Sequence, residues 1–363
     1  MQKKDNRSHD ALVLFSGGLD SLLTARLLMA QGLRILCLHF YTPFFGEQAR
    51  VGRWSRIWGL EIEAIDASSP FLRMFADYPP HGVGKTLNPC VDCKITLLKL
   101  AKELMPAYGA QFIATGEVVG QRPMSQRTDA LNVIAKASET GGILLRPLCA
   151  KHLRPTPMEE SGFVRRELLC NFCGRGRNGQ LALAASLGIT EIPAPAGGCK
   201  LTERENARRY WQLLRPAWLG GEPDLERLRQ DFDLVNHGRI LFHAASGAIL
   251  CIGRNDGDNA AISALSLPDD ITLRLPFPGP RALLRSRRAL WPEISLQAAD
   301  ILCSYAPKSR LGAVSIPVAQ NGPAGRNEVL ARPARHEPDW ILPSWPDTAA
   351  EIHELRRSRT KSA

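Results

Sequence analysis

The chain has 363 residues, of which 44% are hydrophobic and 23% charged, and its formal net charge is +10. This length predicts two or three domains with enough apolar material for a core. No apolar run approaches the ~20 residues that span a bilayer, and the polar start of the chain does not resemble a signal peptide, so we expect a cytoplasmic protein. The basic excess favours a polyanionic partner such as nucleic acid.

The first 150 residues alternate strand-like and helix-like segments, which predicts an α/β fold with a doubly wound parallel sheet. The expected strands cover residues 11–15, 34–40, 61–65, 111–115 and 142–145, and the expected helices cover 21–31, 46–58 and 93–105. Ligands of such sheets bind at the carboxyl ends of the strands, so we expect the functional residues there.

Two further parts follow this sheet. Residues 156–215 are predicted to form a basic helical extension, because Lys and Arg outnumber Asp and Glu by 5 over residues 151–215. A Pro- and Gly-containing linker is expected at 216–223. Short strand signals then predict a smaller α+β domain over 225–345, and 346–363 is expected to be a basic tail. The strand signals lie at 239–243, 248–252, 271–275, 282–284 and 314–318.

A glycine turn follows the first expected strand. Residues 16–21 have the sequence Ser-Gly-Gly-Leu-Asp-Ser, and the apolar stretch after them opens a helix. Several backbone N–H groups and the positive end of a helix dipole would point at one spot, which suits a phosphate. Asp20 adds a carboxylate that suits Mg²⁺ bridging phosphate oxygens, and the alternative is an ordinary helix cap.

Nine cysteines in a reducing compartment do not indicate a disulfide framework. Cys90 and Cys93 are three residues apart at a loop-to-helix junction, Cys170 and Cys173 share that spacing, and Cys199 stands in a glycine-flanked loop. Such groups suit a metal, a cluster or a redox pair, and two CxxC pairs also allow a structural zinc site. The remaining cysteines lie in apolar runs and are expected in the core: Cys37, Cys149, Cys251 and Cys303.

Together these features resemble the PP-loop ATP pyrophosphatase family, and within it the tRNA thiolation enzymes, such as the tRNA 2-thiouridylases and thiouridine synthases. The matching motifs are SGGLDS (16–21), HGVGKTLNPCVDCK (81–94), ATGEVVGQRPMSQ (114–126), LRPLCAKHLRPT (145–156) and PAPAGGCKLT (193–202). They occur in order over residues 11–215. Residues 1–155 would then be the PP-loop ATP-binding domain.

The resemblance implies a reaction that uses ATP, Mg²⁺ and tRNA. A uridine carbonyl oxygen would attack the α-phosphate of ATP and release pyrophosphate, and sulfur from sulfide or a persulfide carrier would then displace AMP. Asp20 is expected to act in catalysis by holding Mg²⁺, and His39 has the alternative of being a core histidine. The implied cofactor-binding residues are Ser16, Gly17, Gly18, Asp20, Ser21, His39, Gly116 and Glu117.

The sulfur-handling cysteines of the family correspond to Cys90, Cys93 and Cys199. Three cysteines favour a [4Fe–4S] cluster ligated by all of them over a persulfide that a second cysteine resolves. Cys170 and Cys173 fit the family pattern less well, so we expect them to be incidental or structural. The alternative function is a PP-loop ligase or amidotransferase that adenylates its substrate without sulfur transfer and needs no cysteine triad.

RNA binding is expected from two parts of the chain. In the region after the nucleotide-binding domain, the candidate contacts are Arg165, Arg166, Arg175, Arg177, Arg208 and Arg209. Further on, CIGRNDGDN (251–259) and PFPGPRALLR (276–285) resemble parts of an RNA-binding domain of the NFACT-R type. The alternative for this domain is an uncharacterised α+β appendage.

Overall fold

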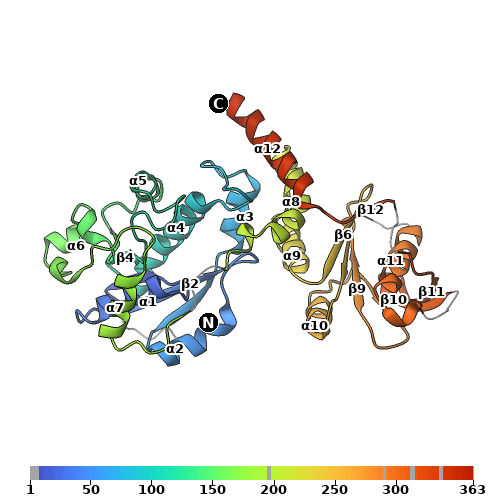
Figure 1. Cartoon of the computed structure of the whole chain (residues 1–363), viewed down its shortest axis with the longest axis horizontal. Helices are drawn as coiled ribbons and strands as arrows, with labels where there is room; N and C mark the ends of the chain where they lie inside the picture. The colour runs from blue at the N-terminus through green and yellow to red at the C-terminus, as the bar shows by residue number, and fades with distance from the viewer. Residues whose placement is uncertain (1–7, 194–197, 289–291, 311–314, 335–337, 363) are drawn as a thin grey trace. The chain divides into compact units, whose positions relative to one another are not determined.

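The computed structural model describes residues 8–193, 198–288, 292–310, 315–334 and 338–362. The chain divides into two compact units, Met1–Thr202 and Glu203–Ala363 (Figure 1). The segment 156–215, expected as one extension, is therefore shared between the units. Within the described ranges, no helix is both long enough and apolar enough to cross a membrane.

A five-stranded parallel sheet forms the centre of the first unit, in the spatial order β3-β2-β1-β4-β5. Its strands are β1 (Ala11–Leu14), β2 (Ile35–Tyr41), β3 (Ile62–Asp66), β4 (Phe112–Thr115) and β5 (Leu144–Leu145). This order confirms the predicted doubly wound sheet. The direction of winding changes between β1 and β4, so a ligand crevice is expected where these two strands end.

Helices cover both faces of this sheet, which explains why its central strands are apolar on both sides. One core lies between the sheet and α1 (Leu19–Met29), α2 (Val51–Trp58) and α7 (Asn178–Ser186). The core on the opposite face includes α4 (Cys90–Tyr108) and α5 (Thr128–Ala137). Neither α5 nor α3 (Ser68–Ala76) was expected from the sequence.

Short elements complete the first unit. They are η1 (Gln48–Arg50), η2 (Ala150–His152), α6 (Pro157–Glu160), η3 (Arg166–Leu168) and η4 (Lys200–Thr202). The four cysteines that were expected in the core are all buried: Cys37, Cys149, Cys251 and Cys303. That expectation is confirmed.

The second unit contains a seven-stranded antiparallel sheet in the order β11-β10-β8-β9-β7-β6-β12, which confirms a separate α+β domain. The strands are β6 (Arg239–His243), β7 (Ile249–Ile252), β8 (Ile271–Arg274), β9 (Arg281–Arg285), β10 (Ile316–Gly322), β11 (Gly325–Ala331) and β12 (Trp340–Ile341). The helices are α8 (Arg204–Trp218), α9 (Leu225–Val235), α10 (Asp256–Ala264), α11 (Pro292–Ser304), η5 (Pro307–Arg310) and α12 (Trp345–Ser362). Val314, where one expected strand begins, lies outside the described residues.

The tail expected at 346–363 is instead the helix α12, which packs on α8. The indole N–H of Trp211 donates to Glu351 at 2.7 Å, and Arg215 lies 3.1 Å from the same carboxylate. Arg359 donates to the carbonyl of Trp218 at 2.7 Å. α8 itself runs through Trp218, so the expected linker is helical at its start.

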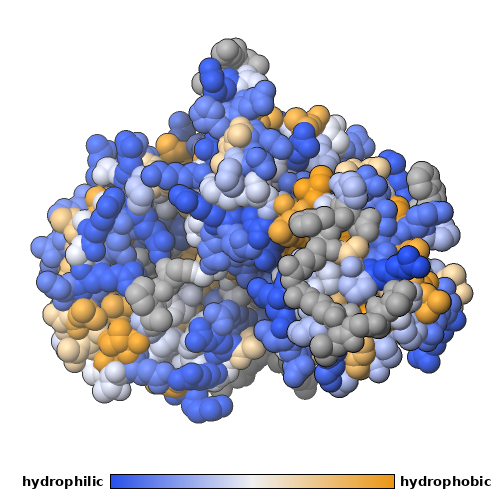
Figure 2. Space-filling model, turned by 45° about the vertical axis from the view of Figure 1, so that its right-hand side comes forward, coloured by the Kyte–Doolittle hydropathy of each residue, from blue (hydrophilic) through white to orange (hydrophobic). Residues whose placement is uncertain are grey.

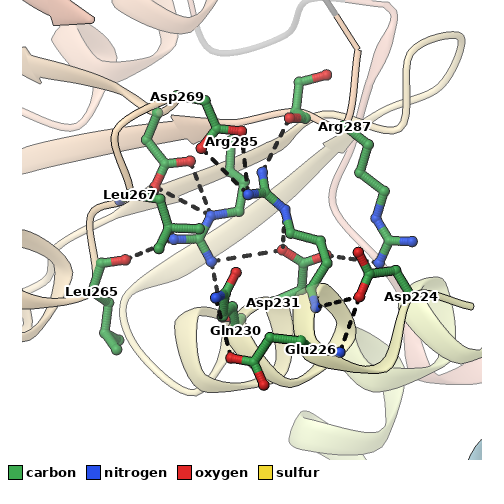
Figure 3. Close-up of polar contacts among 12 residues, drawn as sticks. Asp224, Glu226, Gln230, Asp231, Leu265, Leu267, Asp269, Arg285 and Arg287 are labelled. Carbon is green, nitrogen blue, oxygen red and sulfur yellow. Dashed lines mark hydrogen bonds and ion pairs between the residues drawn. The ribbon is translucent and has the colours of Figure 1, made fainter.

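A buried ionic network joins α9 to the sheet of the second unit (Figure 3). Arg285 on β9 is 1% exposed, and its guanidinium lies 2.8 Å from Asp270 and 3.6 Å from Asp231. It also donates to the carbonyls of Gln230 and Leu265, at 2.8 and 2.7 Å. These bonds use most of the donors of the guanidinium, which is the condition under which a buried charge is tolerated.

Hydrophilic residues cover most of the face drawn in Figure 2, where hydrophobic residues form small separate patches. Scattered apolar residues of this kind are ordinary for a folded protein and need no partner. The charged residues of the surface are therefore a better guide to binding partners than its apolar residues.

Candidate functional site

The glycine turn between β1 and α1 is held closed by its two serines. Ser21 Oγ donates to the carbonyl of Gly18 at 2.9 Å and accepts the backbone N–H of Ser16 at 3.2 Å. The first-turn amides of α1 have no acceptor within the helix, so they are available to an anion. Gly17 has φ +76°, and a Cβ there would lie 2.6 Å from the Trp54 ring, so this position requires glycine.

Asp20, in the first turn of α1, is oriented by a chain of side-chain amides. Gln121 Nε2 donates to Asp20 Oδ2 at 2.7 Å, and Gln180 Nε2 on α7 donates to Gln121 Oε1 at 3.2 Å. Asp20 Oδ1 is buried and accepts no hydrogen bond from the described residues. A buried carboxylate oxygen without a donor fits a cation ligand. Gln121 lies within the matched motif 114–126 but was not singled out from the sequence.

The end of β4 lies directly against the glycine turn. A Cβ on Gly116 would lie 2.6 Å from the carbonyl of Asp20 and 2.7 Å from the amide of Ser21. Gly116 therefore permits close packing of two backbone segments. We expected Gly116 at the nucleotide, and the structure brings it to the turn that we expect to bind the phosphates.

Glu117, just after β4, lies beside two cations. Its side chain is 2% exposed, and Oε2 accepts from Arg146 Nε and Thr115 Oγ1, both at 2.9 Å. Lys94 Nζ lies 3.9 Å from Oε1. Burial alone would raise the pKa of Glu117, but the Lys94 and Arg146 cations outweigh burial and lower it. Glu117 is thus an ionised buried group that holds Lys94 and Arg146, and its Oε1 accepts no hydrogen bond from the described residues, so its expected contact with the nucleotide stays a prediction.

His39 at the end of β2 is a core histidine, as the alternative had it. It is 1% exposed, Nδ1 lies 2.9 Å from the carbonyl of Phe15, and Nε2 accepts the backbone N–H of Glu47 at 2.9 Å. Burial lowers the pKa of His39, so the ring is neutral. Both ring nitrogens are used, and the side chain fixes the segment after β2 instead of offering a bond to a nucleotide.

The first CxxC pair begins α4. Asn88 Nδ2 lies 3.1 Å from Cys90 Sγ and 3.3 Å from Met124 Sδ, which ties the pair to the segment after β4. Asp92, between the two cysteines, is buried and accepts from the backbone N–H of His81, and its Oδ1 lies 2.7 Å from His81 Nδ1. This contact arranges the loop before α4, and no motif in the sequence had indicated it.

The segment that follows Cys199 is hydrogen-bonded to the loop that precedes the first CxxC pair and to the segment after β2. The Lys200 amide donates to the carbonyl of Phe44 at 2.9 Å, and Thr86 Oγ1 donates to the carbonyl of Leu201 at 2.7 Å. Thr86 precedes the CxxC pair, so Cys199 is brought toward Cys90 and Cys93 although more than a hundred residues separate them. Residues 194–197 of the motif PAPAGGCKLT lie outside the described residues.

Cys93 interacts electrostatically with both Cys199 and Cys90. Burial, and next the Cys199 thiol, raise the pKa of Cys93 far above its ordinary value, while Lys94 acts in the opposite direction. Within the described ranges, no three His, Cys, Asp or Glu side chains are grouped as ligands of a single metal ion. Cys90 and Cys199 are nevertheless both close enough to Cys93 to raise its pKa.

The second CxxC pair lies beside the segment that follows β4 and pairs with it through the backbone. Cys173 forms an isolated bridge with Val119, and the Gly174 amide donates to the carbonyl of Val119 at 2.7 Å. Cys173 is exposed, whereas Cys170 is half-buried and burial raises its pKa. The backbone of this pair is thus integrated beside residues 117–121, in keeping with the prediction that Cys170 and Cys173 are incidental or structural, and the roles of the two thiols stay a prediction.

The six candidate RNA-contacting arginines divide into two groups. Arg209 is 6% exposed and donates to the carbonyls of Val235 and Gly238, so its role is structural. Arg166 and Arg208 form ion pairs with Glu159 and Glu205 and also donate to backbone carbonyls. These contacts argue against the RNA role that we expected for Arg166, Arg208 and Arg209. Among the described residues, no side-chain partner holds Arg165, Arg175 or Arg177.

Residues 6–152 match the family model described as thiamine biosynthesis protein (ThiI). This segment is thus similar to the ThiI family over about two fifths of the chain. The match contains the glycine turn, Asp20, Gln121 and the first CxxC pair, and it ends before Cys199.

The names of curated proteins similar to the first part of this chain refer to tRNA and sulfur. The chain is 32% identical over 151 residues to "tRNA sulfurtransferase" of Serratia proteamaculans, covering 38% of this chain and 29% of that protein. It is 28% identical over 146 residues to "Probable tRNA sulfurtransferase" of Lysinibacillus sphaericus, covering 38% and 34%. It is 31% identical over 110 residues to "tRNA-specific 2-thiouridylase MnmA" of Desulfosudis oleivorans, covering 29% and 30%. The chain thus spans about a third of the length of these curated relatives.

Among solved structures, the chain is similar to NMN synthetase from Francisella tularensis, with a TM-score of 0.32, 12% identity and coverage of 63% of this chain and 86% of that one. This value is too low to support an argument, so the fold assignment rests on the sheet topology itself.

Proposed function

We propose that this chain is an ATP-dependent tRNA uridine sulfurtransferase. The observation that carries the proposal is that two contacts, between residues adjacent in sequence to one another, link the glycine turn to the first cysteine pair. Gly116 packs against Asp20, the next residue Glu117 pairs with Lys94, and Lys94 adjoins Cys93. A phosphate bound at the turn and a sulfur held by the cysteines would therefore meet at one edge of the sheet, which suits a reaction that adenylates first and then transfers sulfur.

In the first step, the amides of residues 16–21 bind the phosphates of ATP, and a uridine carbonyl oxygen attacks the α-phosphorus. The bond to pyrophosphate breaks, and the base carries AMP on that oxygen. Asp20 would hold Mg²⁺ through Oδ1, and the ion would neutralise charge on the phosphate oxygens. Lys94, whose side chain is 26% exposed and held by Glu117, stabilises the negative charge that develops on the α-phosphate.

In the second step, sulfur attacks the carbon that carries the adenylate, the C–O bond breaks, and AMP leaves. We propose that Cys90, Cys93 and Cys199 bind a [4Fe–4S] cluster, which would supply the sulfur-transfer chemistry when bound. Thiolate is the ligand that iron–sulfur clusters prefer, and burial together with Cys199 and Cys90 disfavours a free Cys93 thiolate, which a metal sharing its charge would stabilise. The sulfur donor would be sulfide or a persulfide carrier.

For the RNA substrate, we propose that Arg165, Arg175 and Arg177 contact phosphates of tRNA. We also propose that the second unit is an RNA-binding domain of the NFACT-R type, on the basis of the motifs at 251–259 and 276–285. Two observations support these proposals: the chain is basic, and the guanidinium groups at these three positions have no side-chain partner among the described residues.

The proposal is tested by comparing the nucleosides of tRNA from a strain with and without this gene by mass spectrometry. We expect a thiolated uridine to disappear on deletion, to return with the wild-type chain, and to stay absent with Cys199→Ala. An unchanged nucleoside profile would contradict the proposal.

The cluster is tested separately on anaerobically purified protein. We expect a brown protein whose visible absorption is lost in Cys90→Ala, Cys93→Ala and Cys199→Ala but kept in Cys170→Ala and Cys173→Ala. A colourless protein that thiolates tRNA with two of the three cysteines would establish a persulfide route, and colour that depends on Cys170 or Cys173 would show that the other pair binds the cluster.

A further inference from the structure

Two arginines of the second unit face each other across adjacent strands. Arg274 ends β8, Arg281 begins β9, and the two residues are direct partners in the antiparallel register. Directly opposite residues project from the same face of a sheet, with their Cβ atoms close together. Both side chains are exposed.

This pairing places two positive charges together without a carboxylate. Like charges directly opposite each other destabilise a sheet. Other arginines of this unit have acidic partners: Arg285 pairs with Asp270, and Arg254 pairs with Asp258 at 2.7 Å. Among the described residues, no ion pair is formed by Arg274 or Arg281. Several arginines of this unit are thus neutralised by carboxylates, whereas this directly opposed pair has no carboxylate partner among the described residues and can accept an external anion.

The two arginines border a hollow of about 150 Å³ between α10 and the ends of β8 and β9. The hollow is also lined by the short polar side chains of Ser263, Ser266, Thr272 and Asn321. The hydroxyls of Ser263 and Thr272 already donate to the carbonyls of Asn259 and Asn321, which leaves the Ser266 hydroxyl and the Asn321 amide as donors toward the hollow. Two guanidinium groups, one hydroxyl donor and one amide donor around a small space match the oxygens of a tetrahedral oxyanion.

Arg281 is held in place before any ligand binds. Its Nη1 donates to Ser263 Oγ at 3.2 Å, and its backbone N–H donates to Asn259 Oδ1 at 2.9 Å. Ser263 Oγ in turn donates to the carbonyl of Asn259 at 2.8 Å. Because this guanidinium is already ordered, less conformational entropy is lost when an anion binds.

We propose that Arg274 and Arg281, with the Ser266 hydroxyl and the Asn321 amide beside them, form a phosphate-binding site in which Ser263 positions Arg281. The group bound is a phosphate, which reaches the site either as a phosphodiester of RNA or as free phosphate. The RNA source rests on the RNA-binding function proposed above for this unit, whereas phosphate binding itself does not depend on it or on the sulfur chemistry.

The site is tested on the full-length chain with inorganic phosphate as the probe. An arginine-selective dicarbonyl reagent is applied with and without phosphate, and the modification of each arginine is followed by peptide mass spectrometry. We expect phosphate to slow the modification of Arg274 severalfold while leaving Arg56 on α2, which is exposed, unaffected. Equal rates at Arg274 with and without phosphate would overturn the proposal.

Variants show whether the two arginines act together. Arg281→Ala should abolish the protection of Arg274, whereas Arg229→Ala, which removes the same charge from α9, should preserve it. If Arg281→Ala fails to fold by circular dichroism, Ser263→Ala serves instead and should reduce the protection. Full protection of Arg274 in folded Arg281→Ala would contradict the shared site.

A measurement of tRNA affinity distinguishes a phosphodiester of RNA from free phosphate as the ligand. If the ligand is RNA, Arg274→Ala should weaken tRNA binding roughly tenfold, the effect of removing one charged hydrogen bond. If phosphate protects Arg274 but tRNA binds Arg274→Ala as tightly as wild type, the site takes free phosphate. Both outcomes support the site, and the thiolation assay reports on the sulfur chemistry independently of either.

Discussion

The side-chain amide of Gln121 donates a 2.7 Å hydrogen bond to Asp20 Oδ2, and the other oxygen of that carboxylate is buried without a donor among the described residues. The amide thus fixes the orientation of the carboxylate, and Gln180 fixes the amide. An orienting group of this kind determines how well a carboxylate ligates a cation, although it does not touch the cation itself.

Gln121→Ala should therefore weaken Mg²⁺ dependence without unfolding the chain. Loss of such an orienting group costs roughly 10–100-fold in metal affinity or activity. Asp20→Ala should abolish pyrophosphate release, because the ligand itself is removed. Both are measured as pyrophosphate release against Mg²⁺ concentration, with circular dichroism to verify folding. Gln111→Ala, at an exposed position beside β4, is the control, and an equal Mg²⁺ requirement in Gln121→Ala and the control would refute the orienting role.

Glu117→Gln should destabilise the first unit, because it leaves Arg146 buried beside an uncharged amide. Breaking a buried pair from one side costs about 3–5 kcal/mol. The pKa of Glu117 is lowered below its ordinary value of about 4.3, so its contribution is full above that pH and is lost as the pH falls through the lower pKa of the folded state.

Urea unfolding of wild type and Glu117→Gln at neutral and acidic pH measures this effect. The difference between them should be large at pH 7 and shrink as the pH falls below about 4. Glu103→Gln, at an exposed position of α4, should have the same free energy of unfolding as wild type at both pH values. A Glu117→Gln variant as stable as wild type at pH 7 would show that the buried pairs contribute nothing.

Two arginines of the Figure 3 network should differ in their effect on stability. Arg285→Leu leaves Asp270 buried without its main partner, so about 3–5 kcal/mol should be lost. Arg287 is 48% exposed, but it donates at 2.9 Å to Asp231, which is 2% exposed. Arg285 and Arg227 remain beside that carboxylate, so Arg287→Leu should cost less, about 1–3 kcal/mol. Urea denaturation followed by tryptophan fluorescence measures both. Similar losses in the two variants would mean that burial does not govern these pairs.

Replacing Arg175 and Arg177 with alanine should weaken tRNA binding and make it less dependent on salt. Removing one arginine–phosphate interaction reduces the slope of log affinity against log salt by roughly one. Filter binding over a range of salt concentrations measures the slope. Arg34→Ala is the control, since Arg34 directly precedes β2 at the amino end of the parallel strands and pairs with Asp10. An unchanged slope in the double variant would place the RNA-binding surface elsewhere.

The sequence predicted the strand, the glycine turn and the helix around Asp20 because their signals are local. An apolar run, two adjacent glycines and an apolar helical stretch identify β1 and α1 to within two residues. The helix α3 was missed since it begins with Ser68, Ser69 and Pro70, which are also common in loops, although proline is tolerated in the first turn of a helix.

The roles of buried polar residues could not be predicted in the same way. His39 lies within hydrogen-bond distance of the carbonyl of Phe15, one oxygen of Glu117 accepts from Arg146, and Arg209 donates to the carbonyl of Val235. Each partner is supplied by tertiary structure, from 24 to 29 residues away along the chain. The residue type alone is compatible with both a ligand contact and a satisfied position in the core.

The central claim is tested most directly by incubating the purified chain with tRNA, ATP and sulfide and analysing the digested nucleosides by mass spectrometry. The account predicts a thiolated uridine that requires ATP, together with pyrophosphate release. It further predicts that Cys199→Ala releases pyrophosphate without forming that nucleoside, while Cys170→Ala and Cys173→Ala form it normally. Pyrophosphate release by the wild-type chain with tRNA but without any thiolated nucleoside would contradict the account and indicate a ligase that adenylates without sulfur transfer.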